Sequence, residues 1–150
     1  MGASLESCLR FKSPISVDLL TTSAMIVKRE VFNKIGGFDE NFYFNHADGD
    51  FFIRMKKAGY KLMFNPKVIA WHHVRPGPSR NPYYIARDTG YFLAKDVRAK
   101  TLSGWLGFIL NMAYFNTYWF YKALKTGDIK QLEGVWAFLT GVVEYLKRRV

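Results

Sequence analysis

The sequence predicts an α/β fold with a short mixed sheet, flanking helices and two carboxyl-terminal helices. Three observations predict it. Short apolar runs bounded by Gly59 and Pro66 have the length and the edges of strands. Two segments ahead of Gly59 repeat apolar residues at intervals of three and four, as helices do. A stretch without any charged residue, from 101 to 121, then has the length of a long helix.

The first expected elements are a strand between residues 17 and 27 and a short helix after it. The helix should end at Gly36, because glycine readily takes the left-handed conformation that closes a helix, with Phe38 folding back on it. Asp39 then begins a surface loop. The apolar residues at helical spacing are Val31, Phe32 and Ile35.

A second helix should begin near Asp48 and Asp50, because carboxylates in a first turn accept free backbone N–H groups and favour the positive end of the helix dipole. Asp50 and Arg54 lie four residues apart, so an ion pair should hold Asp50 ionised. Asp48 is then free to face outward, where a carboxylate on a rigid helix end can take a proton from a hydroxyl nucleophile. The buried side should consist of Phe51, Phe52 and Met55.

Two other interpretations of Asp48 stay open. The side chain can simply cap the helix. Asp48 and Asp50 also form an Asp-x-Asp pair, the spacing at which two carboxylates share a divalent cation and a diphosphate. We rank the metal interpretation lower, because such a pair usually follows a buried strand. This pair leads into a helix, and Asp50 has Arg54 as a partner.

Two further strands are expected at residues 60–65 and 68–72. Alternation along the second strand puts His72 and His73 on opposite faces, and such a histidine serves either as a ligand or as a hydrogen-bonded structural group. Prolines and a glycine in residues 75–82 exclude regular structure, and two arginines there suit a mobile lid over a diphosphate. The next helix should open with Tyr83, Tyr84 and Arg87.

The charge-free stretch from 101 to 121 is long enough to span a bilayer, but its asparagines, serine and threonines weaken that assignment. Its tryptophans and tyrosines favour the membrane interface, so we expect a helix lying in the headgroup layer. After Gly127, a second helix should carry an apolar stripe of the kind that usually packs in a core or on a partner helix. Basic residues 147–149 suit both a helix carboxyl end and an anionic bilayer. The stripe consists of Ile129, Leu132, Trp136, Leu139, Val143 and Leu146.

Composition limits the class of partner. A net charge of +10 over 150 residues suits a nucleotide diphosphate, lipid headgroups or nucleic acid, or simply a solvated basic surface. The sequence lacks the zinc spacing and RNA-binding signatures of nucleic-acid binders, so we expect no nucleic-acid partner. Cys8 is the only cysteine and residues 1–10 lack a secretory pattern, which indicates a reducing compartment. We therefore expect a cytoplasmic protein, peripheral at the inner face of the cell membrane.

Several of these motifs, in this order, resemble the acceptor-side half of family 2 glycosyltransferases of the inverting, rhamnosyltransferase-like kind, over roughly residues 20 to 98. The family commonly has Glu-Asp before the second helix, and its Asp is the catalytic base. The matching position here is Asp48, and Ala47 stands in place of the Glu. The family's nucleotide-binding half has no counterpart in this sequence. The motifs are residues 21–29, 36–40, 48–50 with Arg54, 58–60, 66–72, Tyr83, Tyr84 and Arg87.

The resemblance implies a partial glycosyltransferase A-type fold and a set of site residues. Asp48 is the implied catalytic base, and His72 is the implied metal ligand. The implied cofactor is a divalent cation, Mg²⁺ or Mn²⁺, held mainly by the absent half. The implied substrate-binding residues are Gly37, Phe38, Asp39, Asp50, Arg54, Ser79, Arg80 and Arg87.

We therefore expect residues 1–99 to form the acceptor-side half of a catalytic domain and residues 100–150 to form a helical, membrane-associating region. By resemblance, the intact reaction is transfer of a sugar from a nucleotide-sugar to a hydroxyl acceptor, such as a membrane or lipid-linked glycan. This chain alone should be inactive without the nucleotide-binding half. It is either the carboxyl-terminal piece of an enzyme or one partner of a split enzyme, whose partner chain would carry that half. The alternative is a non-catalytic module that binds the acceptor, the membrane or a partner chain.

Overall fold

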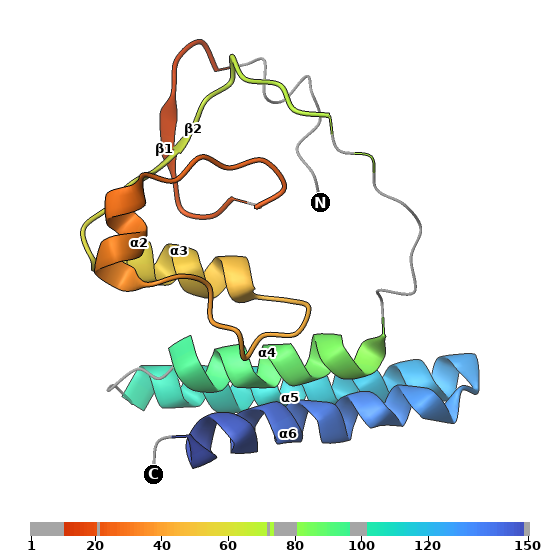
Figure 1. The fold of residues 1–150 in the computed structure, drawn as a ribbon. Coiled ribbons are helices and arrows are strands. Elements are labelled where there is room, and N and C mark those ends of the chain that lie inside the picture. Colours follow the sequence, from red (N-terminus) through yellow and green to blue (C-terminus); the bar gives the residue numbers. More distant parts are fainter. Residues whose placement is uncertain (1–10, 21, 72, 74–80, 97–101, 149–150) are drawn as a thin grey trace.

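The computed structural model describes residues 11–20, 22–71, 73, 81–96 and 102–148. Figure 1 shows two parts: a strand–helix unit of β1, α2, α3 and β2 lies above a helical layer of α4, α5 and α6. The described fold is mixed α/β, as predicted. In chain order the elements are β1 (Ile15–Val17), α2 (Arg29–Ile35), α3 (Ala47–Lys57), β2 (Leu62–Phe64), α4 (Pro82–Asp96), α5 (Leu102–Thr126), the 3₁₀ helix η1 (Ile129–Leu132) and α6 (Glu133–Lys147).

The two strands form a small antiparallel sheet, in which Ile15 lies opposite Phe64 and Val17 lies opposite Leu62. Both short helices pack against this sheet through their apolar sides, and the predicted buried side of α3 is confirmed. Burial of apolar surface is the main stabilising contribution to such a unit. Its buried core consists of Val31, Phe51, Phe52, Met55 and Leu62.

The strand predictions were only partly right. The strand expected at 17–27 is observed at Ile15–Val17, and residues 68–71 form no strand. An extended segment becomes a strand only where a neighbour satisfies its backbone hydrogen bonds. In the part of the chain that the structure describes, such pairing extends over only three residues of β2, Leu62–Phe64. The expected mixed sheet is therefore a two-stranded antiparallel one in that part.

The predicted helices agree better with the structure than the predicted strands do. The first helix, α2, ends at Gly36, which has φ +77° and donates its N–H to the carbonyl of Phe32 at 2.9 Å. This is the left-handed stop that the glycine predicts. The ring of Phe38 packs against Phe51 of α3, with ring centroids 4.7 Å apart. Phe38 therefore anchors the loop between the two helices to the core.

Within the helical layer, α4 and α6 approach closely because glycines lie at their contact. A Cβ atom added to Gly141 would lie 2.7 Å from the backbone nitrogen of Tyr91, and one added to Gly90 would lie 2.9 Å from the carbonyl carbon of Phe138. Neither helix has room for a side chain at these points. The long helix α5 joins the layer through ring stacking of Phe115 on Phe138 at 5.7 Å. The helix α4, expected to belong with residues 1–99, thus shares a core with α5 and α6.

The apolar stripe of α6 lies on the outside, which corrects its interpretation as core of this chain. The side chains of Trp136 and Leu146 are 73% and 52% exposed. Close packing on α4 selects small residues, so the bulky stripe on the other side of the helix faces outward. None of the helices in the described ranges is long and apolar enough to cross a membrane. The buried face of α6 consists of Gly134, Ala137, Phe138, Gly141 and Tyr145.

Candidate functional site

The loop that leads into α3 is fixed to the helical layer by one carboxylate. Asp88 of α4 is fully buried, and it accepts hydrogen bonds from the backbone N–H groups of Tyr43, Phe44 and Asn45 at 3.3, 2.7 and 2.8 Å. A buried carboxylate that satisfies three backbone donors is a strong positional constraint. The start of α3, two residues further on, is thereby held against α4.

Arg87 forms an ion pair with Asp88 and so helps to hold the carboxylate that binds the loop. Its guanidinium lies 2.8 Å from Asp88, and it also contacts Glu144 of α6 and the backbone carbonyl of Asn41. Burial disfavours the charged form, but hydrogen bonds and ion pairs with Asp88 and Glu144 outweigh it and raise the pKa of Arg87. The expected contact between Arg87 and a diphosphate stays a prediction, and in this structure the side chain is 1% exposed and joins three segments of the chain.

A second ion-pair cluster holds the other end of the loop. Lys95 of α4 lies 2.6 Å from a carboxylate oxygen of Asp39 and 2.6 Å from one of Asp50. Burial alone would raise the pKa of Asp39, but hydrogen bonds from Lys95 and Asn41 outweigh it and lower that pKa. Asp39 and Asp50, both expected to bind substrate, are therefore both in contact with an internal cation, Lys95.

The predicted pair of Asp50 and Arg54 is present, with Nε 2.9 Å from the carboxylate. The same guanidinium donates to the carbonyls of Ile35 and Gly37, each at 2.7 Å. Arg54 therefore closes the end of α2 onto α3, and Gly37 contributes its backbone carbonyl to that contact. With both oxygens of Asp50 in ion pairs, the metal-binding interpretation of Asp48 and Asp50 loses one of its two carboxylates.

Asp48 differs from these carboxylates. It is half-buried in the first turn of α3, and it accepts a hydrogen bond from the backbone N–H of Gly49 at 2.9 Å. Among the residues that the structure describes, no cation forms an ion pair with it. The N-cap position belongs to His46, so the N-cap interpretation of Asp48 was wrong by two residues. Its carboxylate lies at the amino-terminal end of α3, which is the positive end of the helix dipole.

His46 is a site residue that the sequence analysis missed. Its backbone has φ +65°, and its ring stacks on Phe92 with centroids 4.7 Å apart. Its Nε2 lies 3.0 Å from the hydroxyl of Thr89, which donates its own proton to the carbonyl of Ile85. Nε2 must then carry the hydrogen in the neutral ring, and Nδ1 is the free acceptor. Burial lowers the pKa of His46 more than the charges of Asp88 and Asp48 raise it, so the ring is neutral near pH 7.

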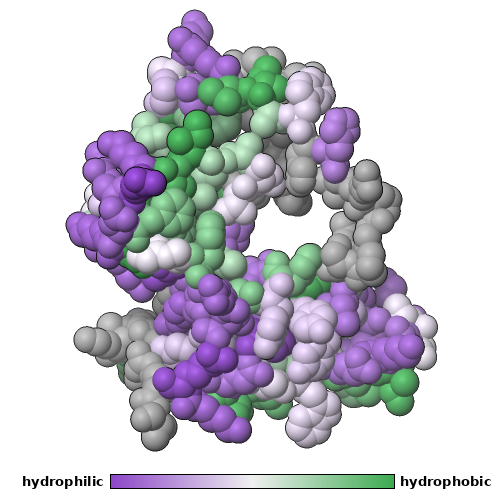
Figure 2. Space-filling view, viewed as in Figure 1, coloured by the Kyte–Doolittle hydropathy of each residue, from purple (hydrophilic) through white to green (hydrophobic). Residues whose placement is uncertain are grey.

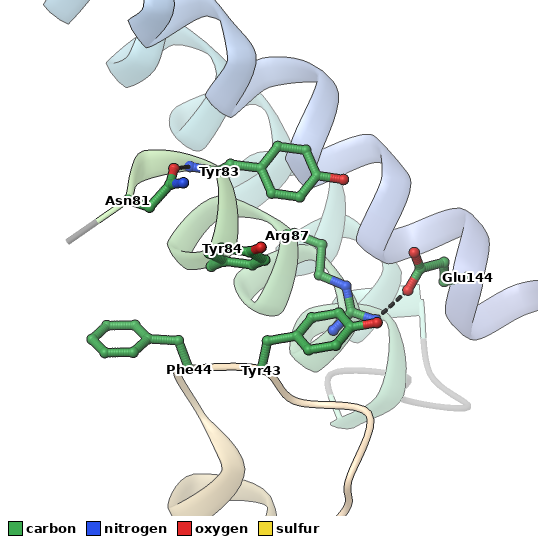
Figure 3. A pocket seen from close by; sticks show the side chains of 7 residues that line it. All are labelled: Tyr43, Phe44, Asn81, Tyr83, Tyr84, Arg87 and Glu144. Carbon is green, nitrogen blue, oxygen red and sulfur yellow. Dashed lines mark hydrogen bonds and ion pairs between the residues drawn. The ribbon is translucent and has the colours of Figure 1, made fainter. Parts of the chain in front are cut away.

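An open hollow of about 760 Å³ lies where the loop meets α4 and α6. We call it the aromatic hollow. Figure 3 shows its rings around the ion pair of Arg87 and Glu144, with Tyr43 over the guanidinium at 4.4 Å and 5.8 Å from Tyr84. Aromatic faces beside a half-buried ion pair suit a ligand with both apolar and polar surface. The lining residues are Tyr43, Phe44, Asn81, Tyr83, Tyr84, Arg87 and Glu144.

Three of the expected site residues, His72, Ser79 and Arg80, lie outside the described residues. Within the described ranges, no group of three or more histidine, cysteine or acidic side chains is placed to hold a metal ion. The carboxylates near Asp48 do not fit a cation site either, because Asp39 and Asp50 already contact Lys95. The structure thus brings together Gly37, Asp39, Asp50 and Arg54 as supports and leaves the carboxylate of Asp48 without an ion-pair partner among them.

Comparison with known proteins finds a partial similarity to glycosyltransferases. Over 66 residues, 44% of this chain, the sequence is 33% identical to N-acetylglucosaminyl-diphospho-decaprenol L-rhamnosyltransferase from two strains of Mycobacterium tuberculosis. The match spans 22% of the length of these relatives. No family model and no solved structure matches the chain. The relationship to glycosyltransferases is therefore a coarse one, over less than half of this chain.

Proposed function

We propose that this chain forms the acceptor side of a glycosyltransferase of family 2, with a partial A-type fold, and that Asp48 is the general base. The reaction transfers a sugar from a nucleotide-sugar to a hydroxyl acceptor. One observation supports it most: the carboxylate that the resemblance assigns as base lacks a described ion-pair partner, whereas Asp39 and Asp50 are both paired with Lys95. The partial similarity to a rhamnosyltransferase supports the same reaction class.

The chemistry of Asp48 follows from its position. A carboxylate in the first turn of a fixed helix accepts the proton of the acceptor hydroxyl as the oxygen attacks the anomeric carbon. The loop cannot carry α3 away from α4, because Asp88 holds the backbone just before Asp48. Such fixed placement is worth several orders of magnitude in rate, since it removes the search for a reactive geometry.

The aromatic hollow is the proposed contact for the acceptor. The exposed rings of Tyr43 and Tyr84 offer faces on which the CH groups of a sugar ring stack. The relatives' names describe an N-acetylglucosaminyl-diphospho-decaprenol acceptor and an L-rhamnosyl group, so these are the substrates to try first. Among the described residues, no group of three or more possible ligands is placed to hold the proposed divalent cation. The proposed proton transfer by Asp48 does not depend on that cation.

The test uses the native polypeptide that contains these residues, purified from its source cell. Transfer of labelled rhamnose from a nucleotide-rhamnose to an N-acetylglucosaminyl-diphospho-polyprenol is measured for the wild type and for Asp48→Asn. Loss of the base should lower kcat by about 10² to 10⁴-fold. Glu40→Gln, which removes an exposed carboxylate from the same loop, is the matched control and should keep its activity. Tyr84→Ala should raise the acceptor KM and leave the affinity for the donor unchanged.

The alternative is a non-catalytic module that binds the acceptor, the membrane or a partner chain. It predicts that neither the wild type nor any variant transfers sugar, whatever the donor. Retained transfer by Asp48→Asn would contradict the assignment of Asp48 as the base, but it would still agree with the proposed sugar transfer. These two outcomes separate the role of Asp48 from the proposed function of the whole chain.

A further inference from the structure

The helix α5 buries one narrow side only. Phe115, Trp119 and Ala123 lie on that side and pack against the other helices. With 3.6 residues per turn, Leu110 and Tyr121 lie on the opposite side of the helix from Trp119. Both side chains are large and apolar, and they are 60% and 59% exposed. A helix of a water-soluble protein usually carries polar residues there. The large exposed residues of α5 are Leu102, Trp105, Leu106, Ile109, Leu110, Tyr114, Tyr118, Phe120, Tyr121 and Leu124.

The outward side of α6 has the same character. Because α6 packs on α4 through its glycine-containing face, the apolar stripe of Trp136, Leu139, Val143 and Leu146 is left without a partner in the described structure. Figure 2 shows a few hydrophobic residues between hydrophilic ones at the lower edge of the helical layer. Exposed apolar residues on two adjacent helices exceed the scattered ones that a soluble surface normally shows.

The charges around these two helices are mostly positive. The helix α5 contains no acidic residue and ends in Lys122 and Lys125, and α6 ends in Lys147 and Arg148. Lys125 lies over the ring of Tyr121 at 6.0 Å, and that ring is exposed, so this charge lies beside the exposed aromatic surface. Three acidic residues follow position 101: Asp128 caps η1, Glu144 pairs with Arg87, and Glu133 is exposed in the first turn of α6. A cationic rim around apolar and aromatic residues complements an anionic lipid surface.

We propose that the outward faces of α5 and α6 bind the headgroup layer of an anionic bilayer. Three features favour lipid over a second copy of this chain or another protein. The exposed apolar residues cover more than one side of α5, a convex shape that a fluid bilayer accommodates. Tryptophan and tyrosine, which prefer the membrane interface, are frequent there. The lysines lie at the ends of the apolar stretch, where they reach lipid phosphates. The proposal does not rest on sugar transfer.

The test is binding of the 150-residue chain to vesicles of phosphatidylcholine with about a third phosphatidylglycerol, measured by co-sedimentation at low salt. The first variant is Leu106→Asp/Leu110→Asp, which changes exposed positions of α5, and it should lower the partition coefficient at least tenfold. Its matched control is Ile26→Asp/Val68→Asp, which adds the same charge at positions 99% and 66% exposed on the strand–helix unit. The control should bind within about twofold of the wild type.

The second variant is Lys122→Gln/Lys125→Gln. Each lysine near an anionic surface contributes roughly a fivefold factor, so this variant should bind about 25-fold less and its binding should depend less steeply on salt. Its control, Lys28→Gln/Lys67→Gln, removes the same charge from the other part of the molecule. The proposal would be overturned if the variants and their controls lost vesicle binding to the same extent, or if the wild type did not bind vesicles at low salt. So would self-association in sedimentation velocity without lipid that Leu106→Asp/Leu110→Asp abolishes, because a second copy would then be the occupant.

Discussion

Gly141 is the position where the contact between α4 and α6 is most sensitive to a single methyl group. A Cβ atom there would lie 2.7 Å from the backbone nitrogen of Tyr91, and it would lie closer still to the carbonyl oxygen of Arg87. Both neighbours are helix backbone, which cannot rotate away as a side chain can. Gly141→Ala must therefore push α6 away from α4 by about an ångström, and this weakens the contact of Arg87 with Glu144.

The expected change combines two opposing contributions. Overpacking of a core costs about 1–3 kcal/mol, and backbone neighbours place this site at the upper end. Alanine regains about 1 kcal/mol over glycine through helix propensity. The net loss of unfolding free energy is then about 2 kcal/mol, which corresponds to a Tm lower by about 4–8 °C for a chain of this length.

The assay is urea unfolding of the 150-residue chain, followed by far-ultraviolet circular dichroism. Gly107→Ala is the matched control, because nothing lies within 4 Å of a Cβ atom at Gly107 in the middle of α5. That variant should gain about 0.5–1 kcal/mol. A Gly141→Ala protein as stable as the wild type would refute the close approach of α4 and α6.

Two further predictions concern the ion pairs and the histidine. Lys95→Met should cost about 2–3 kcal/mol in urea unfolding, because it leaves the fully buried Asp50 with one cation instead of two, whereas Lys28→Met at an exposed pair should change stability by less than about 0.5 kcal/mol. The pKa of His46 is lowered in the folded state, so the unfolded chain takes up a proton first as pH falls below the ordinary value of 6.5. Stability should therefore decrease on acidification from about pH 7.5 to 5.5, and His46→Asn, which tolerates the left-handed backbone, should flatten that decrease. An unchanged pH profile in that variant would contradict the burial of the ring.

The sequence was enough to predict the helices around the site. A glycine at the end of α2 and acidic residues in the first turn of α3 are local signals, and both gave helices within a few residues of the observed bounds. The pair of Asp50 and Arg54 could be predicted as well, because its spacing of four residues depends on one helix only.

The supports of the site could not be predicted, because they join distant parts of the chain. Asp88 holds Phe44 from 44 residues away, and Lys95 holds Asp39 from 56 residues away. No periodicity in the sequence indicates such contacts. The sequence shows His46 two residues before Asp48, but the stacking of its ring on Phe92 depends on α4 and could not be predicted.

The orientation of α6 could not be predicted either, for a different reason. Large apolar residues at intervals of three and four give the strongest pattern in that segment, and that pattern identifies a helix correctly. It does not identify the buried face, because the close contacts are made at glycines: Gly141 meets the backbone of α4, and Gly134 meets the ring of Trp119 in α5. Glycine contributes little to a hydrophobic stripe, so the face that packs on α4 was the less conspicuous one.

The most direct test of Asp48 as the general base measures two quantities on the same preparation of the native polypeptide: the rate of sugar transfer and the Kd for the nucleotide-sugar. For Asp48→Asn, we predict a transfer rate lower by about 10² to 10⁴-fold with an unchanged Kd, because the carboxylate acts on the acceptor hydroxyl. Glu40→Gln should change neither quantity. Transfer by Asp48→Asn at the wild-type rate would contradict the assignment of Asp48.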